Sequence, residues 1–182
     1  MFISVDEIAQ TIKMIQEEHL DIRTVTMGIS LLNCARGDMK STSTAVYDKI
    51  CKKAEKLVPV AESIERELGI PIVNKRISIT PASLIVGDAT ASECVELAKM
   101  LEKAAVTTGV NFIGGYSALV HKGYTNADRV FISSIPEALD NTTRVCSSVN
   151  LATTKTGINM DAVRDMGILI KKAAELSKDT GG

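Results

Sequence analysis

Arg144–Met160 reads R-V-C-S-S-V-N-L-A-T-T-K-T-G-I-N-M, and this stretch carries the clearest signal for the fold. It begins as a strand-like run in which Val145, Val149 and other apolar residues stand among small hydroxyl residues. A polar loop that contains Gly157 follows, and Asn159 then begins a helical pattern. A strand that leads through a polar loop into a helix N-terminus is a ready site for an anion or another ligand. The alternative is an ordinary connection whose hydroxyl groups only cap the backbone.

The rest of the chain repeats this alternation of strand and helix. Further strands are predicted at 22–29, 70–81 and 110–120, and helices at 4–18, 41–68, 90–108, 128–139 and 160–177. Pro59 predicts a kink or two abutting helices within the second helical segment. This order predicts mainly parallel strands joined by right-handed crossovers, so the fold class is α/β, either an open sheet or part of a barrel. The strands show little strict alternation, which is typical of a sheet covered on both faces.

Size and charge indicate one globular domain that does not bind nucleic acid. The length of 182 residues suits a single domain over residues 1–182. The net charge of −1, from 21 basic and 22 acidic residues, gives no overall field that attracts nucleic acid. Three Tyr, three Phe and no Trp leave few side chains on which bases could stack.

The chain also lacks the signals of membrane insertion and of secretion. No stretch is long and apolar enough to span a membrane, and the first residues lack the basic region of a signal peptide. Cys34, Cys51, Cys94 and Cys146 are far apart and no His cluster accompanies them, so we expect reduced thiols and no metal site. We therefore expect a cytoplasmic protein without a membrane partner.

Three polar residues interrupt the strand predicted at 70–81. Side chains alternate along a strand, so Asn74 and Arg76 project to one face and Lys75 to the other. A charge in a strand interior is either a device that protects a sheet edge from aggregation or a group that faces a cavity. Both interpretations stay open on the sequence alone.

The strand predicted at 110–120 contains two adjacent glycines. Gly114 and Gly115 indicate a bulge or the close approach of another group to the backbone. They are not part of a G-x-G-x-x-G dinucleotide motif, and Lys155 lacks the upstream glycine of a phosphate-binding loop. His121 follows this strand, where it is either a solvated loop residue or an acid–base group.

Our first functional hypothesis is a ligand-binding or catalytic site where 144–159 meets 114–122 and 74–76. Cys146 would be a nucleophile or redox group whose thiolate is stabilised by Arg76 or Lys155, and His121 would be the acid–base group. The ligand would be a small anionic metabolite that carries phosphate or carboxylate. The residues expected to hold it are Asn74, Lys75, Arg76, Gly114, Gly115, Ser117, Ser147, Ser148, Asn150, Lys155 and Asn159.

The second hypothesis is a non-catalytic regulatory or assembly module. In this case the polar strand residues form hydrogen bonds with one another, and the function of the fold is to form an interface with another copy. Stabilisation by an anionic metabolite would support the first hypothesis, whereas stability that depends on protein concentration would support the second. Composition and motifs name no cofactor, and whether the chain is an enzyme stays open.

Four segments together resemble the N-terminal part of uncharacterised protein family 0210, also called domain-of-unknown-function family 711. They are D-I-R-T-V-T-M-G-I-S-L-L (21–32), G-I-P-I-V-N-K-R-I-S-I-T-P (69–81), G-V-N-F-I-G-G-Y-S-A-L-V (109–120) and the run from S-I-P-E-A-L (134–139) to T-K-T-G-I-N-M (154–160). The resemblance implies part of an α/β barrel similar to pyruvate formate-lyase and other glycyl radical enzymes. It implies no reaction, because the activity of the family is not established.

Members of this family are longer than the 182 residues of this chain. The resemblance therefore implies the N-terminal portion of a longer domain or a shortened member. Radical chemistry is not expected, because the sequence contains no radical-glycine motif and a shared fold does not transfer a mechanism. Part of a barrel would expose sheet edges and apolar helix faces, so we expect a homo-oligomer.

Overall fold

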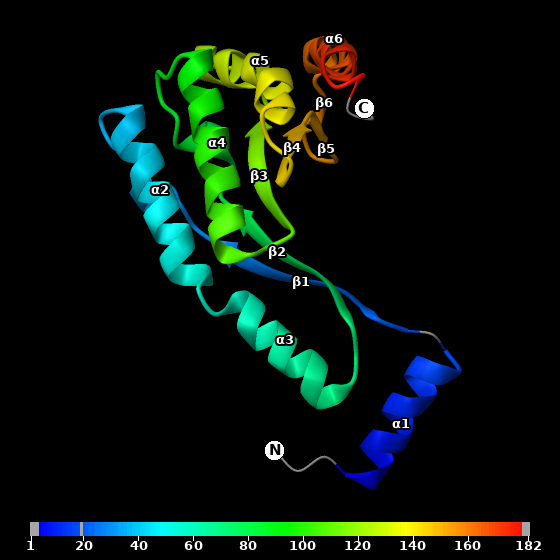
Figure 1. Cartoon of the computed structure of the whole chain (residues 1–182). Helices are drawn as coiled ribbons and strands as arrows, with labels where there is room; N and C mark the ends of the chain where they lie inside the picture. The colour runs from blue at the N-terminus through cyan, green and yellow to red at the C-terminus, as the bar shows by residue number, and fades with distance from the viewer. Residues whose placement is uncertain (1–3, 19, 180–182) are drawn as a thin grey trace.

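The computed structural model describes residues 4–18 and 20–179, which form alternating helices and strands (Figure 1). The helices are α1 (Val5–Gln16), α2 (Met39–Ala54), α3 (Leu57–Leu68), α4 (Ala91–Thr108), α5 (Asn126–Asp140) and α6 (Met160–Leu176). The strands are β1 (Ile22–Ile29), β2 (Ile72–Ile79), β3 (Phe112–Leu119), β4 (Val145–Asn150), β5 (Ala152–Thr153) and β6 (Gly157–Ile158), and short 3₁₀ turns occupy Leu32–Cys34 and Ala82–Leu84.

The first four strands form one parallel sheet. They are ordered β1-β2-β3-β4, and each neighbouring pair is parallel, which confirms the predicted α/β class. The segment after β4 is not a plain loop, because β5 and β6 pair as a small antiparallel hairpin before α6 begins. The hairpin tip lies at residues 154–156, and Asn159 caps α6 by accepting a hydrogen bond from the Ala162 amide.

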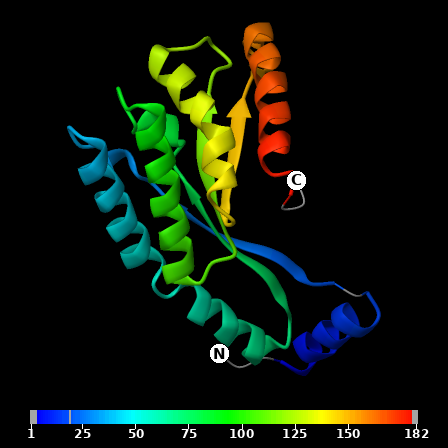
Figure 2. The ribbon, with the colours of Figure 1, turned by 45° about the horizontal axis from the view of Figure 1, so that its top comes forward.

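The helices α2, α3, α4 and α5 lie on the same face of the sheet (Figures 1 and 2). Inward side chains of the strands, such as Ile29 and Ile77, join these helices in one apolar core. On the other face Thr26, Ser78 and Cys146 are exposed. The expectation of a sheet covered on both faces is therefore wrong for the part of the chain that the structure describes. Alternation is present, but glycines and small polar residues on the open face hide it in the sequence.

The start of α2 differs from the sequence prediction. Asp38 caps α2 through a 2.8 Å hydrogen bond from the Ser41 amide, three residues before the helix start predicted at residue 41. The long helical segment divides into α2 and α3, as one of the two alternatives for Pro59 predicted. Pro59 itself lies in the first turn of α3, where its missing N–H leaves no hydrogen bond unmade.

Gly115 forms a bulge where β3 passes β2. Its φ is +119°, and the register between β3 and β4 shifts from Gly114 to Tyr116. A Cβ on Gly115 would lie 2.5 Å from Cγ1 of Ile79 and 2.6 Å from the Ile79 carbonyl oxygen. Both features predicted for the glycine pair, a bulge and a close backbone approach, are therefore confirmed at Gly115.

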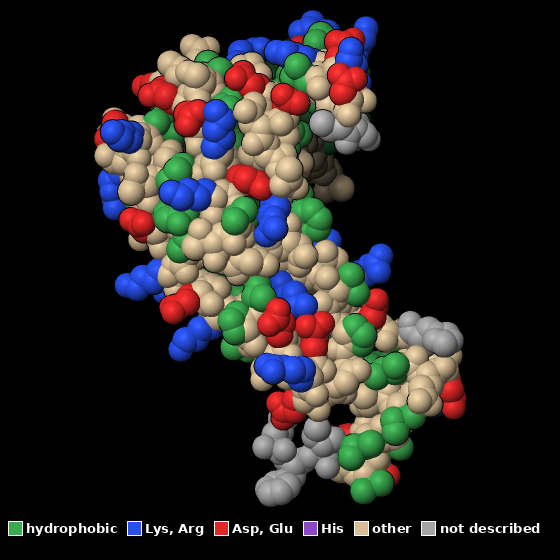
Figure 3. Space-filling model, viewed as in Figure 1, with side chains coloured by type: hydrophobic (Ala, Val, Ile, Leu, Met, Phe, Trp, Pro, Cys, Tyr) green, Lys and Arg blue, Asp and Glu red, His purple; other side chains and the backbone are tan. Residues whose placement is uncertain are grey.

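The surface of the helix-covered face shows no concentration of one charge. Figure 3 shows Lys and Arg side chains interspersed with Asp and Glu side chains over these helices. α1 lies apart from them at the end of the sheet and buries none of its own residues (Figure 1). Within the described residues, no helix combines the length and the apolar character needed to cross a bilayer.

Candidate functional site

Strand pairing arranges the open face of the sheet in two transverse rows. In the first row Thr26, Arg76 and Phe112 are register partners on β1, β2 and β3. In the second row the partners are Gly28, Ser78, Gly114 and Cys146 on β1 to β4. Partners in parallel strands project to the same face, so each row forms a band across the sheet.

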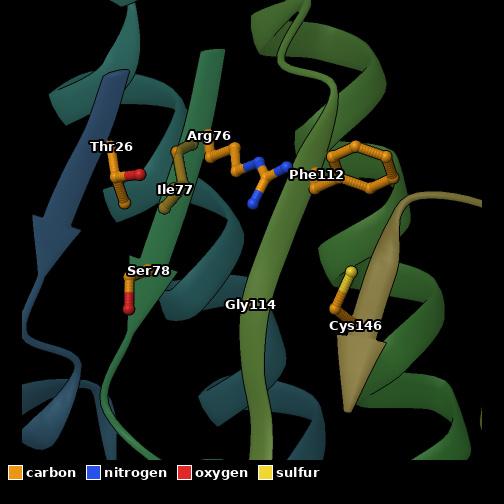
Figure 4. A pocket seen from close by; sticks show the side chains of 7 residues that line it. All are labelled: Thr26, Arg76, Ile77, Ser78, Phe112, Gly114 and Cys146. Carbon is orange, nitrogen blue, oxygen red and sulfur yellow. The ribbon is translucent and has the colours of Figure 1, made fainter. Parts of the chain in front are cut away.

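The residues of these rows, Gly28 excepted, line a cleft of about 330 Å³ (Figure 4). The guanidinium of Arg76 extends from β2 toward β3 and the ring of Phe112, and Cys146 lies beyond Gly114 on β4 (Figure 4). Residues of both rows therefore border one volume, which can admit a small molecule. The lining residues are Thr26, Arg76, Ile77, Ser78, Phe112, Gly114 and Cys146.

Arg76 is a cation without a carboxylate partner among the described residues. Its Cζ lies 5.2 Å from the centroid of the Phe112 ring, a cation–π contact that partly compensates the charge. Its Nε is buried and donates no hydrogen bond within the described structure. A buried donor on a charged group is unfavourable unless a partner meets it, and an anion in the cleft would be such a partner.

Cys146 is the exposed cysteine of this chain. Cys34 and Cys94 are buried, and Cys51 is partly buried against the core. Burial raises the pKa of the Cys94 thiol to about 11, which makes that sulfur unreactive near neutral pH. The thiol that lines the cleft is therefore also the one that reagents can reach.

The structure separates the three polar residues at the centre of β2. Lys75 projects to the helix-covered face, where its Nζ donates hydrogen bonds of 2.8 Å to Oε2 of Glu65 and to the Ile72 carbonyl. Asn74 shares the face of Arg76, and its amide donates to the Arg23 carbonyl at 3.3 Å. The arrangement of alternate faces is as predicted, but β2 pairs on both sides, so the sheet-edge interpretation is wrong. Lys75 binds α3 to β2 and does not reach the cleft.

The serines predicted as ligand-binding residues do not share one environment. Ser148 is exposed on the open face, next to its register partner Ser117, which is buried and donates to the Gly115 carbonyl at 3.3 Å. Ser147 projects the other way, and its buried Oγ has no hydrogen-bond partner among the described residues. Only Ser148 of these three offers a free hydroxyl to a ligand on the open face.

The remaining predicted residues gather at the carboxyl ends of β3 and β4. The Asn159 amide donates to the Val120 carbonyl at 2.7 Å while its Oδ1 caps α6, so this side chain is fully used by the fold. The Asn150 carbonyl accepts from the Val120 amide at 3.0 Å. His121 follows directly, and its buried Nδ1 has no partner in the described structure.

Lys155 is not brought together with Cys146. It lies on the exposed turn of the β5–β6 hairpin, beyond the end of β4 at Asn150. Cys146 stands four residues before Asn150, which is roughly 13 Å along a strand. The predicted site is thus divided into a cleft that contains Arg76, Gly114 and Cys146 and a separate edge cluster around His121.

Sequence reasoning missed Thr26, Ser78 and Phe112 as cleft residues. The signal was present as a period of two, since Thr24, Thr26 and Gly28 alternate with the core residues of β1. Asn74, Arg76 and Ser78 repeat the pattern on β2. No three His, Cys, Asp or Glu side chains within residues 4–18 and 20–179 are grouped so that they could hold a metal ion.

Comparison with known sequences identifies the family of this chain. Residues 13–182 match the family described as "Uncharacterised ACR (DUF711)". A UPF0210 protein of Acetivibrio thermocellus is 62% identical over 176 residues, which are 97% of this chain and 39% of the relative. A UPF0210 protein of Listeria monocytogenes is 59% identical, and one of Thermoanaerobacter sp. 60% identical, each over 97% of this chain and 39% of the relative. The chain spans about two fifths of the length of these relatives, and it belongs to the DUF711 family of uncharacterised proteins.

Proposed function

We propose that the cleft on the open face of the sheet binds a small anionic metabolite, with Arg76 as the group that recognises its charge. The single observation that supports this most strongly is the guanidinium itself. It stands on an interior strand, lines the cleft, and has a ring contact but no carboxylate partner among the described residues. Arginine in such a position is suited to hold a carboxylate or a phosphate through paired hydrogen bonds.

The other cleft residues support binding of a small molecule in particular. Thr26 and Ser78 bring hydroxyl groups that can donate to an anion, and Gly114 leaves space above β3. Cys146 adds a thiol that could act as a nucleophile on a bound electrophile. The unpaired thiol also fits a reducing, cytoplasmic compartment, which we propose as the location of the protein.

For the full-length relatives we propose that this face lines the interior of a closed fold. The chain covers 39% of their length, and α2, α3, α4 and α5 lie on one face of its sheet while the other face carries the cleft. A sheet with helices outside and an uncovered inner face is what part of an α/β barrel presents. The resemblance to the pyruvate formate-lyase barrel agrees with this arrangement. Closure of such a barrel would convert the open cleft into an enclosed site.

A thermal-shift experiment with acetate, benzoate and inorganic phosphate tests the proposed anion site. The expected result is stabilisation by at least one of these anions that Arg76→Gln abolishes, because a ligand that binds only the folded state raises its stability. Lys155→Ala is the matched control, since it removes an exposed positive charge outside the cleft. A shift that survives Arg76→Gln but disappears in Lys155→Ala would reject the cleft in favour of the hairpin.

A second candidate function, assembly into a homo-oligomer, rests on the apolar surface of α6. This helix packs Ala162, Met166 and Leu169 toward the rest of the protein. A second stripe, Val163, Gly167 and Ile170, also has helical spacing, and the side chain of Ile170 is 64% exposed. We propose that another copy of the chain covers this stripe.

Sedimentation should show a dimer that Ile170→Glu dissociates, and a monomer at high micromolar concentration would reject the proposal.

A further inference from the structure

We infer that the cleft accepts a flat carboxylate, an aromatic or conjugated acid that lies on a floor of glycine backbone between Arg76 and Cys146. This inference rests on the proposed function of the cleft and specifies the class of its ligand. It follows from three features: the flat backbone surface at Gly114, which we call the floor, the positive charge of Arg76 beside it, and the distance across the strands from β2 to β4.

The floor is flat because Gly114 carries no side chain and the neighbouring Ser78 carries a small one. Gly28 and Gly114 flank Ser78 in the second row, and a Cβ built on either glycine would meet nothing within 4 Å. Neither glycine has the positive φ that would require this residue. Glycine inside a strand is less stable than alanine by about 0.5–1 kcal/mol. The fold itself therefore does not need these glycines, and their position indicates that an outside group approaches the backbone there.

The side chains beside this floor favour a ligand that carries a single negative charge. Arg76 is the cation in the first row, and its neighbours there, Thr26 and Phe112, are uncharged. One guanidinium matches the charge and the two oxygens of one carboxylate, whereas a phosphate dianion would leave charge uncompensated. A flat acid can place its carboxylate against Arg76 and its face on the peptide groups of Gly114.

Strand spacing sets the length of the ligand. Ser78 on β2 and Cys146 on β4 are two strand spacings apart, which is about 10 Å. The Arg76 guanidinium already extends from β2 toward β3, so this distance is an upper limit for an acid that extends from the guanidinium to the sulfur of Cys146. Sulfur makes favourable contacts at the edges of aromatic rings, so an exposed thiol suits this end of the cleft.

The test compares two acids of equal charge and equal number of non-hydrogen atoms, trans-cinnamate and 3-cyclohexylpropanoate. trans-Cinnamate is flat because its double bond is conjugated with the aromatic ring, whereas the cyclohexyl ring of the second acid is puckered. Titration calorimetry of the complete 182-residue chain should give cinnamate an affinity at least about tenfold higher. Arg76→Gln should remove this binding, and Gly114→Ala should weaken it about tenfold by placing a methyl group on the floor.

Gly37→Ala is the matched control, because it adds the same methyl group in open space between β1 and α2, at a residue that does not line the cleft. Ser78→Leu, which places a large side chain on the floor beside Gly114, is the second cleft variant if Gly114→Ala fails to give a folded spectrum by circular dichroism. Equal, Arg76-dependent binding of the two acids would keep the anion site and overturn the flat ligand. Binding of cinnamate that is unchanged by Arg76→Gln and by the floor variants would place the ligand elsewhere and also overturn the inference. Absence of any Arg76-dependent binding of either acid would reject the flat ligand, and, if the smaller anions also fail, the anion site with it.

Discussion

Arg76 and Cys146 acquire their place in the cleft from the register of the strands that carry them. Arg76 is opposite Phe112, and Cys146 is opposite Gly114. A shift of one residue in either strand would move the side chain to the helix-covered face, since successive residues alternate. The cleft is therefore stable only as long as the apolar core fixes that register, with Ile77 and Val145 buried beside the two residues.

Thiol reactivity should distinguish the cysteines at the residue scale. We expect Cys146 to react with a disulfide reagent such as 5,5′-dithiobis(2-nitrobenzoate) far faster than Cys34 and Cys94, which are buried. The raised pKa of Cys94, due to burial, reinforces this order. The measurement is a stopped-flow labelling trace, with Cys146→Ser as the control that should lose the fast phase. Retention of the fast phase in Cys146→Ser would contradict the assignment.

The two adjacent glycines should respond in opposite ways to alanine. Gly115→Ala should destabilise the protein by about 2 kcal/mol or more, because its φ is +119° and the added Cβ would lie 2.5 Å from Ile79. Gly114→Ala should be neutral or stabilising by up to about 1 kcal/mol, because its Cβ enters open space. Urea unfolding of the pair measures both free energies. Similar values for the two variants would show that the bulge is wrongly placed.

At the scale of elements, the connection between α3 and β2 depends on one partly buried ion pair. Glu65 of α3 accepts hydrogen bonds from Lys75 Nζ at 2.8 Å and from the Ile72 amide at 2.6 Å. These bonds, the one from Lys75 first, lower the pKa of Glu65 below its ordinary value of 4.5. Lys75, predicted as a ligand-binding residue, thus has a structural task on the covered face.

The pH dependence of stability should reveal this connection. A carboxyl group whose pKa is lower in the folded state stabilises the protein above its unfolded pKa, and this stabilisation is lost as pH falls through the folded pKa. The difference in unfolding free energy between the wild type and Glu65→Gln should therefore be constant near neutral pH and decrease below about pH 4.5. Urea unfolding at a series of pH values measures it. A difference that does not change with pH would contradict the proposed role of the charge.

The sequence predicts these elements well where the signal is local. The β-branched run at 22–29 has the bounds of β1, and the helices predicted to begin at residues 4 and 90 are α1 and α4, which Ser4 and Thr90 cap. The β5–β6 hairpin was missed because two strands of two residues each carry no periodicity. The open face was missed because glycines and small polar residues on it hide the period of two along β1 and β2. Arg76 was recognised from its charge inside a strand, whereas Thr26 and Ser78 were not recognised.

At the scale of the whole molecule, the sheet is asymmetric, with helices on one face and a cleft on the other. The relatives that align with 97% of this chain are longer, and this chain spans 39% of their length. We propose that in those proteins the open face is enclosed, so that Arg76 and Cys146 become interior groups. Binding of small anions by this chain alone should then be weaker than binding by a full-length relative, because enclosure excludes water from the ion pair. Parallel titrations with benzoate compare the two.

The central claim, that Arg76 and Cys146 share an anion-binding cleft, is tested most directly by alkylation of Cys146. Iodoacetate and iodoacetamide react by the same displacement, but only the first carries a negative charge. The account predicts that the rate ratio of iodoacetate to iodoacetamide at Cys146 exceeds that of glutathione about tenfold, since a nearby guanidinium concentrates the anion. Arg76→Gln should return the ratio to the glutathione value, and Lys155→Ala should leave it high. A wild-type ratio equal to that of glutathione would contradict the account.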